Sequence, residues 1–133
     1  MRQMKPYIHK VKYYECDQMG VTHHSNYVRF MEEARVDLLD QVGYGFEKLE
    51  AAGVVSPVLN INVKYLKPSR FQDEIAISVS FKKISAFKFR FHYVMKIGET
   101  IICTAESLHC FMENGRPVLV EERFPGVVEA LES

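Results

Sequence analysis

The longest helical pattern in the chain lies in its N-terminal third. Apolar side chains recur there at steps of three and four residues, the period of an α-helix, at Tyr27, Phe30, Met31, Ala34, Leu38 and Val42. Ser25 and Asn26 precede the pattern as good capping residues, and Gly43 can end the helix. Val28 and Leu39 widen the apolar stripe to roughly half of the helix circumference. We therefore expect this helix to be covered on several sides.

Arg35 falls inside the apolar stripe of this helix. One interpretation is a long aliphatic stem whose charged head reaches a surface or a subunit interface. The other is a desolvated guanidinium paired with a carboxylate, because an unpaired buried charge costs several kcal/mol. The pattern alone leaves both open.

After residue 56 the pattern changes to the two-residue period of β-strands. Three segments alternate in this way and are each predicted to have one buried face: Pro57–Lys67, Asp73–Ile84 and Phe87–Ile97. In the first of them, the predicted buried side chains are Leu59, Ile61, Val63 and Tyr65. Gly98 and Glu99 are expected to turn the chain into a longer strand, Thr100–Met112. The remaining predicted elements are a first strand at Pro6–Tyr14, a short helix at Phe46–Ala52, a strand at Pro117–Val120 after the Asn114-Gly115 turn, and a terminal helix at Phe124–Ser133.

One long helix and several antiparallel strands with apolar inner faces predict an α+β domain. The helix is too apolar to lie outside the sheet, so a five- to six-stranded antiparallel sheet is expected to curl around it, which is the hotdog architecture. With 133 residues and no internal repeat or linker, the chain is predicted to form a single domain over residues 1–133.

Composition excludes several classes of partner. Lys and Arg total 17 and Asp and Glu total 17, so no net charge favours nucleic acid or an anionic membrane. The N-terminus has no apolar signal region and no segment approaches ~18 apolar residues, so neither secretion nor membrane insertion is expected. Cys16, Cys103 and Cys110 are an odd number without metal-type spacing, which indicates free thiols and a cytoplasmic location.

The segment that leads into the long helix carries a motif. Asp17 is followed three positions later by Gly20, and the helix opens on Asn26 and Tyr27, in the run DQMGVTHHSNY. With YLKPSRFQDE at residues 65–74 and GRPV at residues 115–118, this run resembles the signature of hotdog-fold acyl-CoA thioesterases of the 4-hydroxybenzoyl-CoA thioesterase family, particularly its YbgC-like branch. The resemblance covers nearly the whole chain. It departs at Thr22-His23-His24, where many relatives carry aromatic or other polar residues, so the acyl group stays open.

This resemblance implies hydrolysis of an acyl-CoA or acyl-carrier thioester without a metal or other cofactor. Such an enzyme needs a group that brings oxygen to the acyl carbon and donors that stabilise the resulting oxyanion. By resemblance, Asp17 attacks the carbonyl or activates water, and the backbone N–H of His24 at the helix N-terminus donates to the oxyanion. Gly20 would allow the tight turn between these groups, and Tyr27 completes the predicted catalytic set.

The same residues allow other interpretations. Asp17 before a glycine turn is also an ordinary turn-forming residue. His23 and His24 could bind a metal, although adjacent histidines on a loop share one ion poorly and no second ligand cluster is present. The imidazole of His24 could itself act as an acid or base. Glu32 and Glu33 are expected to form a solvated helix face, although other hotdog thioesterases use a helical Glu.

Two further function classes remain as alternatives. A hotdog hydratase or dehydratase would use an Asp/His pair to move water across a C=C bond of an acyl thioester. A non-catalytic domain would bind the acyl group without turnover. Release of free thiol, loss of enoyl absorbance, or binding alone would distinguish the three.

The resemblance also implies partners. We expect a homodimer or a dimer of dimers, paired through the Pro57–Lys67 strand, which has no obvious protection of its edge. A thioester that carries phosphates needs cations near the mouth of the site. The candidate substrate-binding residues are His23, Asn60, Lys64, Lys67, Arg70, Lys83, Lys88 and Arg90.

Overall fold

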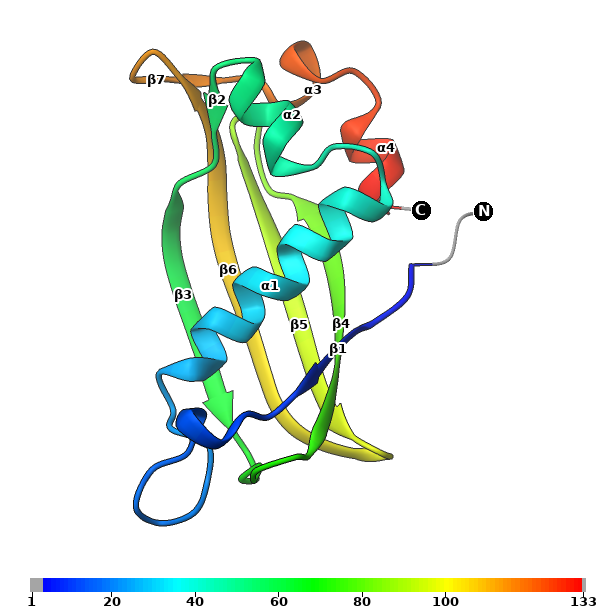
Figure 1. The fold of residues 1–133 in the computed structure, drawn as a ribbon. Helices are drawn as coiled ribbons and strands as arrows, with labels where there is room; N and C mark the ends of the chain where they lie inside the picture. The colour runs from blue at the N-terminus through cyan, green and yellow to red at the C-terminus, as the bar shows by residue number, and fades with distance from the viewer. Residues whose placement is uncertain (1–3, 133) are drawn as a thin grey trace.

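The computed structural model describes residues 4–132, which form a curved antiparallel sheet with one long helix across one face (Figure 1). That helix is α1, Asn26–Gln41. The strands are β1 (Tyr7–Lys10), β2 (Val54–Val55), β3 (Val58–Tyr65), β4 (Glu74–Lys83), β5 (Lys88–Ile97), β6 (Thr100–Glu113) and β7 (Arg116–Val118). The shorter helical segments are the 3-10 turn η1 (Tyr13–Glu15), α2 (Phe46–Ala51), α3 (Val120–Arg123) and α4 (Val127–Glu132). No helix among these is long and apolar enough to cross a membrane.

The sheet runs in the order β1-β4-β5-β6-β2, and β3 and β7 also pair with β6. Its centre follows the predicted alternation, since Ile75 and Ile77 of β4 and Phe91 and Tyr93 of β5 are buried on one face. Helix α1 packs its own apolar stripe on that face. Burial of six of its side chains at ~1.5–3 kcal/mol each contributes on the order of 10 kcal/mol before conformational entropy is counted.

The prediction of an α+β domain whose antiparallel sheet curls around one long helix is confirmed. The described sheet has seven strands rather than five to six. The strand that was not predicted is the short β2, which pairs with the end of β6 beyond its partner β3. The first strand is shorter than predicted. It pairs only with β4, which begins opposite Lys10, so the chain beyond has no strand to pair with and turns into η1.

The C-terminal boundaries also differ from the prediction. Strand β7 ends at Val118, and the chain enters α3 at Val120, so the predicted strand end is wrong there. The predicted terminal helix is present as α4, but it begins three residues later, at Val127, after the Pro125-Gly126 pair. Ser133, the predicted end of that helix, lies outside the described residues.

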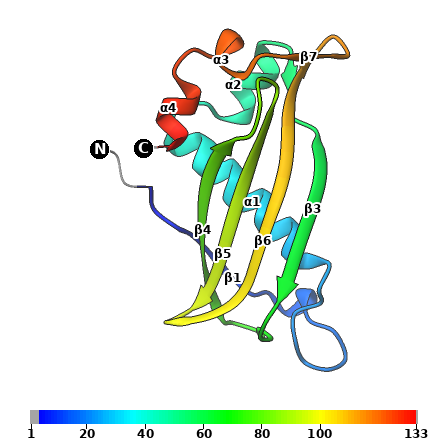
Figure 2. The same ribbon diagram turned by 180° about the vertical axis from the view of Figure 1, so that it is seen from behind.

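The predicted buried face of the Pro57–Lys67 strand is wrong for the single chain. Leu59, Ile61 and Tyr65 of β3 are 46%, 36% and 49% exposed. Strand β3 pairs with β6 on one side only, and α1 packs over β4 and β1 instead (Figures 1 and 2). The strand is therefore an edge strand. Tyr65 at its end contacts the Tyr27 ring and the His24 carbonyl, whereas Leu59 and Ile61 stay partly exposed.

Arg35 is buried at 6% exposure, which excludes the interpretation that its head reaches the surface of the single chain. Its Nη1 donates to the Tyr93 hydroxyl at 3.0 Å, whereas the nearest carboxylate, Glu32, lies 4.0 Å from Nη2 and is mostly exposed. The Tyr93 hydroxyl continues to Ser107 Oγ at 2.6 Å, and Ser107 Oγ to His109 Nε2 at 2.7 Å. A chain of buried polar groups therefore crosses the core from α1 to β6.

Candidate functional site

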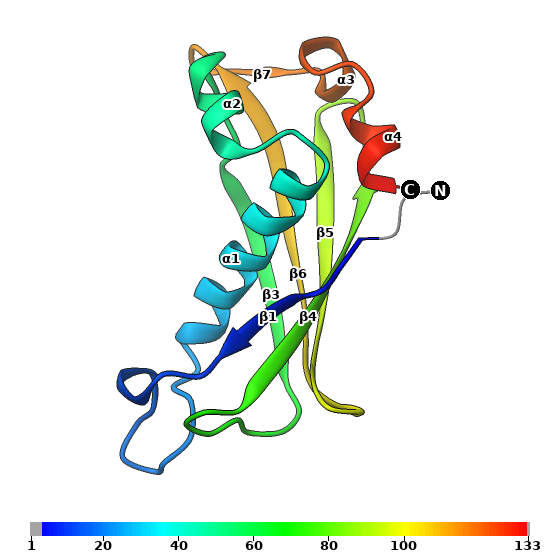
Figure 3. The ribbon, with the colours of Figure 1, turned by 45° about the vertical axis from the view of Figure 1, so that its right-hand side comes forward.

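The motif segment forms a tight loop where the sheet and α1 meet at one end of the molecule (Figure 3). Cys16 and Thr22 pair as an isolated antiparallel bridge. Inside it, the Asp17 N–H donates to the Val21 carbonyl at 2.9 Å and the Gly20 N–H donates to the Asp17 carbonyl at 3.0 Å. Gly20 has φ of 78°, a left-handed conformation that residues with a β-carbon rarely adopt. The loop geometry thus requires glycine at this position.

The Asp17 carboxylate is oriented by its own loop. Its Oδ1 accepts the Met19 N–H at 2.8 Å, as in an ordinary Asx turn. Among residues 4–132, no donor contacts Oδ2. The carboxylate lines an open groove of about 800 Å³ whose other lining residues are Tyr13, Tyr14, Cys16, Gln18, Gly20 and Phe71. Turn formation therefore uses one oxygen and leaves the other available to a substrate or a water molecule.

The peptide between His23 and His24 presents a free N–H at the start of α1. The His23 carbonyl accepts the Asn26 N–H at 3.0 Å. Because the peptide is planar and trans, the His24 N–H points the opposite way, away from the helix. No acceptor for it lies within residues 4–132. The next carbonyl, that of His24, accepts the Tyr27 N–H at 3.2 Å and the Tyr65 hydroxyl at 3.0 Å. The His24 N–H is therefore held in its orientation by the hydrogen bonds of the carbonyls on both sides of it. It lies at the positive end of the helix dipole.

The Tyr27 hydroxyl belongs to a chain of hydrogen-bonded side chains that holds the loop in place. Its side chain is buried, and its hydroxyl lies 2.9 Å from Ser69 Oγ, which in turn lies 2.6 Å from the Thr22 hydroxyl. The Thr22 N–H also donates to the Ser69 carbonyl at 2.8 Å. Burial raises the pKa of Tyr27, so its hydroxyl stays protonated. The structure thus places Tyr27 as a support of the loop, away from the groove.

Two residues that build this end of the molecule, Ser69 and Glu15, were not identified as site residues from the sequence. Ser69 lies in the β3–β4 connection, which reads as a plain turn. Glu15 accepts the His23 N–H and the Asn26 side-chain amide on its backbone carbonyl, each at 2.8 Å. Neither belongs to a periodic pattern, so only the motif resemblance around them could have indicated their importance.

The two histidine rings are exposed and stacked, with ring centroids 4.2 Å apart. His23 Nδ1 lies 2.9 Å from Ser25 Oγ, and the His24 ring lies edge-on to Tyr65. Among the residues that the structure describes, no group of three or more His, Cys, Asp or Glu side chains could hold a metal ion.

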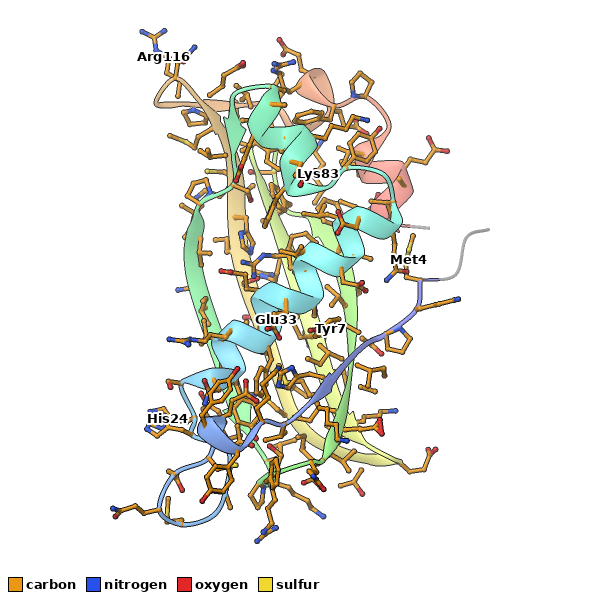
Figure 4. The ribbon with its side chains drawn as sticks, in the orientation of Figure 1. Met4, Tyr7, His24, Glu33, Lys83 and Arg116 are labelled. Atoms are coloured by element: carbon orange, nitrogen blue, oxygen red, sulfur yellow. The ribbon has the colours of Figure 1, made fainter. Side chains whose placement is uncertain are left out.

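The predicted substrate-binding cations fall into two places. Lys67 and Arg70 flank Ser69, at the same end as Asp17. Lys64 precedes them on the outer face of the sheet, and the alternation along β3 places Asn60 on the same face. Three other cations, Lys83, Lys88 and Arg90, lie toward the far end of β4 and β5. Figure 4 shows His24 and Lys83 at opposite ends of the molecule. Arg90 is also 3.8 Å from Glu106.

Comparisons with known proteins show the family and the fold. Residues 11–130 match the model of the Thioesterase-like superfamily. The chain is 32% identical over 119 residues to YneP of Bacillus subtilis, a protein assigned as an acyl-CoA thioesterase, covering 87% of this chain and 86% of YneP. A hypothetical protein from Aquifex aeolicus, known by crystal structure, superposes with a TM-score of 0.88 at 32% identity, covering 95% of this chain and 98% of the other. The DHNA-CoA thioesterase from Staphylococcus aureus superposes with a TM-score of 0.88 at 25% identity, covering 95% and 87%.

Proposed function

The chain belongs to the Thioesterase-like superfamily of hotdog enzymes, and from this premise we propose that it hydrolyses acyl-CoA thioesters to the free acid and CoA. The proposal rests on two groups that one short loop presents. The Asp17 carboxylate has one oxygen that accepts no hydrogen bond from the described residues. The oriented His24 N–H at the start of α1 has no acceptor among them. These are the two groups that hydrolysis of a thioester requires.

In the proposed reaction, Asp17 uses its free oxygen in one of two ways. It attacks the acyl carbon and expels the thiolate, leaving an anhydride that water cleaves, or it removes a proton from a water molecule that attacks. Both routes place negative charge on the former carbonyl oxygen. The His24 N–H would then donate to that oxygen, and a donor of this kind typically contributes ~3–4 kcal/mol to stabilising the transition state.

The test is Asp17→Asn. The amide retains an oxygen that can accept the Met19 N–H, so the turn is preserved while the charge is lost. We expect kcat for acyl-CoA hydrolysis, measured by thiol release, to fall at least ~10²-fold with an unchanged melting temperature. Asp73→Asn is the matched control, because Asp73 Oδ2 likewise accepts a loop N–H, that of Arg70, at 2.7 Å. If Asp17→Asn keeps more than about a tenth of the wild-type rate, Asp17 does not carry the chemistry.

A single turnover in ¹⁸O-water tests the anhydride route. Cleavage of an anhydride at the Asp17 carbonyl leaves ¹⁸O in the Asp17 side chain, which peptide mass spectrometry detects, and this label would establish the anhydride. Label in the released acid alone results from attack by an activated water and equally from cleavage of the anhydride at the acyl carbonyl.

A further inference from the structure

Three exposed aromatic side chains gather beside the candidate site loop. Tyr13 and Tyr14 of η1 are each 78% exposed, and Phe71 of the β3–β4 connection is 48% exposed. The ring centroids of Tyr13 and Phe71 lie 5.6 Å apart, and the two rings are nearly perpendicular, at 78°. Large apolar side chains that are exposed singly are common, whereas a contiguous group of them marks a binding surface. We call Tyr13, Tyr14 and Phe71 the aromatic cluster.

The aromatic cluster lines two adjoining grooves. One is the groove of about 800 Å³ that contains the Asp17 carboxylate. The other, of about 510 Å³, follows β1 and η1 and is also lined by Lys10 and Lys12. Figure 3 shows that β1 leads into η1 at the end of the molecule where β3 and β4 are connected. Because all three aromatic residues line both grooves, one extended ligand can reach from Asp17 across the cluster to the two lysines.

Positive charge surrounds the aromatic cluster. Lys10, Lys12 and Arg70 have exposed side chains, and Arg70 directly precedes Phe71. None of the three forms an ion pair within residues 4–132. Glu74 lies opposite Lys10 in the pairing of β1 with β4, but the two side chains form no ion pair either. A ligand that uses both features therefore combines a flat apolar part with negative charge.

The arrangement of the rings suits a nucleotide base better than an acyl chain. A planar base can stack on one ring of the perpendicular pair and turn its edge to the other, and both arrangements are ones that aromatic rings prefer. The polar edge of the base then stays in water, which fits rings that are exposed to this extent. An acyl chain would keep much of its apolar surface in water here, and it has no group for the cations to bind.

We propose that the aromatic cluster binds the adenine of the CoA substrate, and that Lys10, Lys12 and Arg70 attract the phosphates of the same nucleotide. The thioester end of the substrate then extends along the first groove to Asp17. This inference rests on the proposed function for the identity of the substrate, whereas binding of the nucleotide part alone requires no turnover.

The first experiment measures binding of the nucleotide part. The probe is adenosine 3′,5′-bisphosphate, which has the adenine and the 3′-phosphate of CoA but no pantetheine and no thioester. Isothermal titration calorimetry should show that it binds the wild type, and that Tyr13→Ala and Phe71→Ala each weaken this binding about tenfold. Phe87→Ala is the matched control, because Phe87 is 43% exposed and lines neither groove. Its affinity for the probe should equal that of the wild type.

The outcomes of this titration separate the inference from the proposed function. No binding of the probe at millimolar concentration, or equal binding by the wild type and both cluster variants, would overturn the inference even in an active thioesterase. Binding that weakens as expected in a protein without thioesterase activity would instead support a nucleotide site and refute the proposed function. Melting temperatures of the variants check that each one is folded.

The second experiment distinguishes binding of the nucleotide from binding of the acyl group. The same acyl group is offered on CoA and on pantetheine, which has no nucleotide, and kcat/KM is measured for both thioesters. Tyr13→Ala and Phe71→Ala should each lower the ratio of the CoA value to the pantetheine value about tenfold, whereas Phe87→Ala should leave it unchanged. A ratio that stays at its wild-type value in both cluster variants would place another part of the substrate on the aromatic cluster and overturn the inference.

Discussion

At the scale of single residues, His24 presents two candidate groups, its backbone N–H and its imidazole. The N–H is oriented by hydrogen bonds of the adjacent peptides, whereas the exposed ring contacts the rings of His23 and Tyr65. We therefore expect His24→Ala to keep most of kcat. His24→Pro removes the donor and should cost ~3 kcal/mol of transition-state stabilisation, about a hundredfold in rate. The measurement is a pH–rate profile of both variants; loss of most of the rate together with a histidine limb in His24→Ala would assign the chemistry to the ring instead.

The buried side chain of His109 makes the stability of the fold depend on pH. Burial, followed by the nearby charge of Arg35, lowers the pKa of His109 from about 6.5 to about 4. Between these values the unfolded chain binds a proton that the folded chain excludes, so stability is retained above about pH 6.5 and lost as the pH falls toward 4. The difference corresponds to on the order of 3 kcal/mol.

We expect His109→Gln, which can still bond Ser107, to remove this part of the acid sensitivity. Urea unfolding at fixed protein concentration from pH 7 to pH 4 would measure it. The free energy of unfolding of the wild type should fall relative to that of the variant as the pH falls, by up to about 3 kcal/mol. Two curves that stay parallel would mean that His109 is not held neutral in the core.

The sequence indicated candidate site residues only where one compact motif contains them, and their roles stay predictions. Asp17 and His24 are separated by seven positions, so one run of letters contains both. Ser69, by contrast, reaches the site loop across 47 positions of sequence from Thr22. No period or spacing rule relates residues on different elements. Such pairings become visible only when the fold brings the elements together.

At the scale of elements, the hydrophobic period predicted whether a segment is a helix or a strand better than it predicted what covers the faces of that element. The 3.6-residue pattern placed α1 within one or two residues of its observed ends. The alternation in β3 also predicted a strand correctly. Alternation reports that two faces of a strand differ; it does not report what covers each face. The apolar face of β3 was therefore assigned to the core of its own chain, which leaves Leu59 and Ile61 on that face partly exposed.

Two cation clusters give a prediction about how the phosphates of CoA bind. They are Lys64/Lys67/Arg70 and Lys83/Lys88/Arg90. The first lies at the Asp17 end, so its triple-Ala variant should raise KM for acyl-CoA with little change in kcat. A short thioester without phosphates should be unaffected. Lys83 of the second cluster lies far from His24 within one chain (Figure 4), and Lys88 and Arg90 neighbour it on β5. The triple-Ala variant of this second cluster should change neither value unless a partner chain brings it to the site.

Steady-state kinetics on both thioesters would test these expectations. If neither variant shifts KM for acyl-CoA, the phosphates bind elsewhere or the natural carrier is not CoA. An effect of the second cluster alone would indicate that substrate binds between two chains.

At the scale of the whole molecule, the β3 edge of the sheet exposes a row of apolar side chains. Strand β3 carries Leu59, Ile61 and Tyr65 half exposed in a row, beside an unpaired backbone edge. Native proteins normally protect such an edge from pairing, and β3 has neither a Pro within it nor a charge on its apolar face. Tyr65 also donates to the His24 carbonyl, so whatever covers β3 lies against the candidate site loop.

We therefore predict a homodimer paired through β3, with its site completed at the interface. Light scattering should give at least twice the mass of one chain. Leu59→Lys should reduce that mass to the monomer and lower kcat, because a charge at this apolar edge opposes pairing. Ile8→Lys is the matched control: Ile8 is 52% exposed on β1, the opposite edge strand, and the change there should leave the mass unaltered. A wild-type monomer with full activity would refute the dimer, and an active Leu59→Lys monomer would show that one chain holds the complete site.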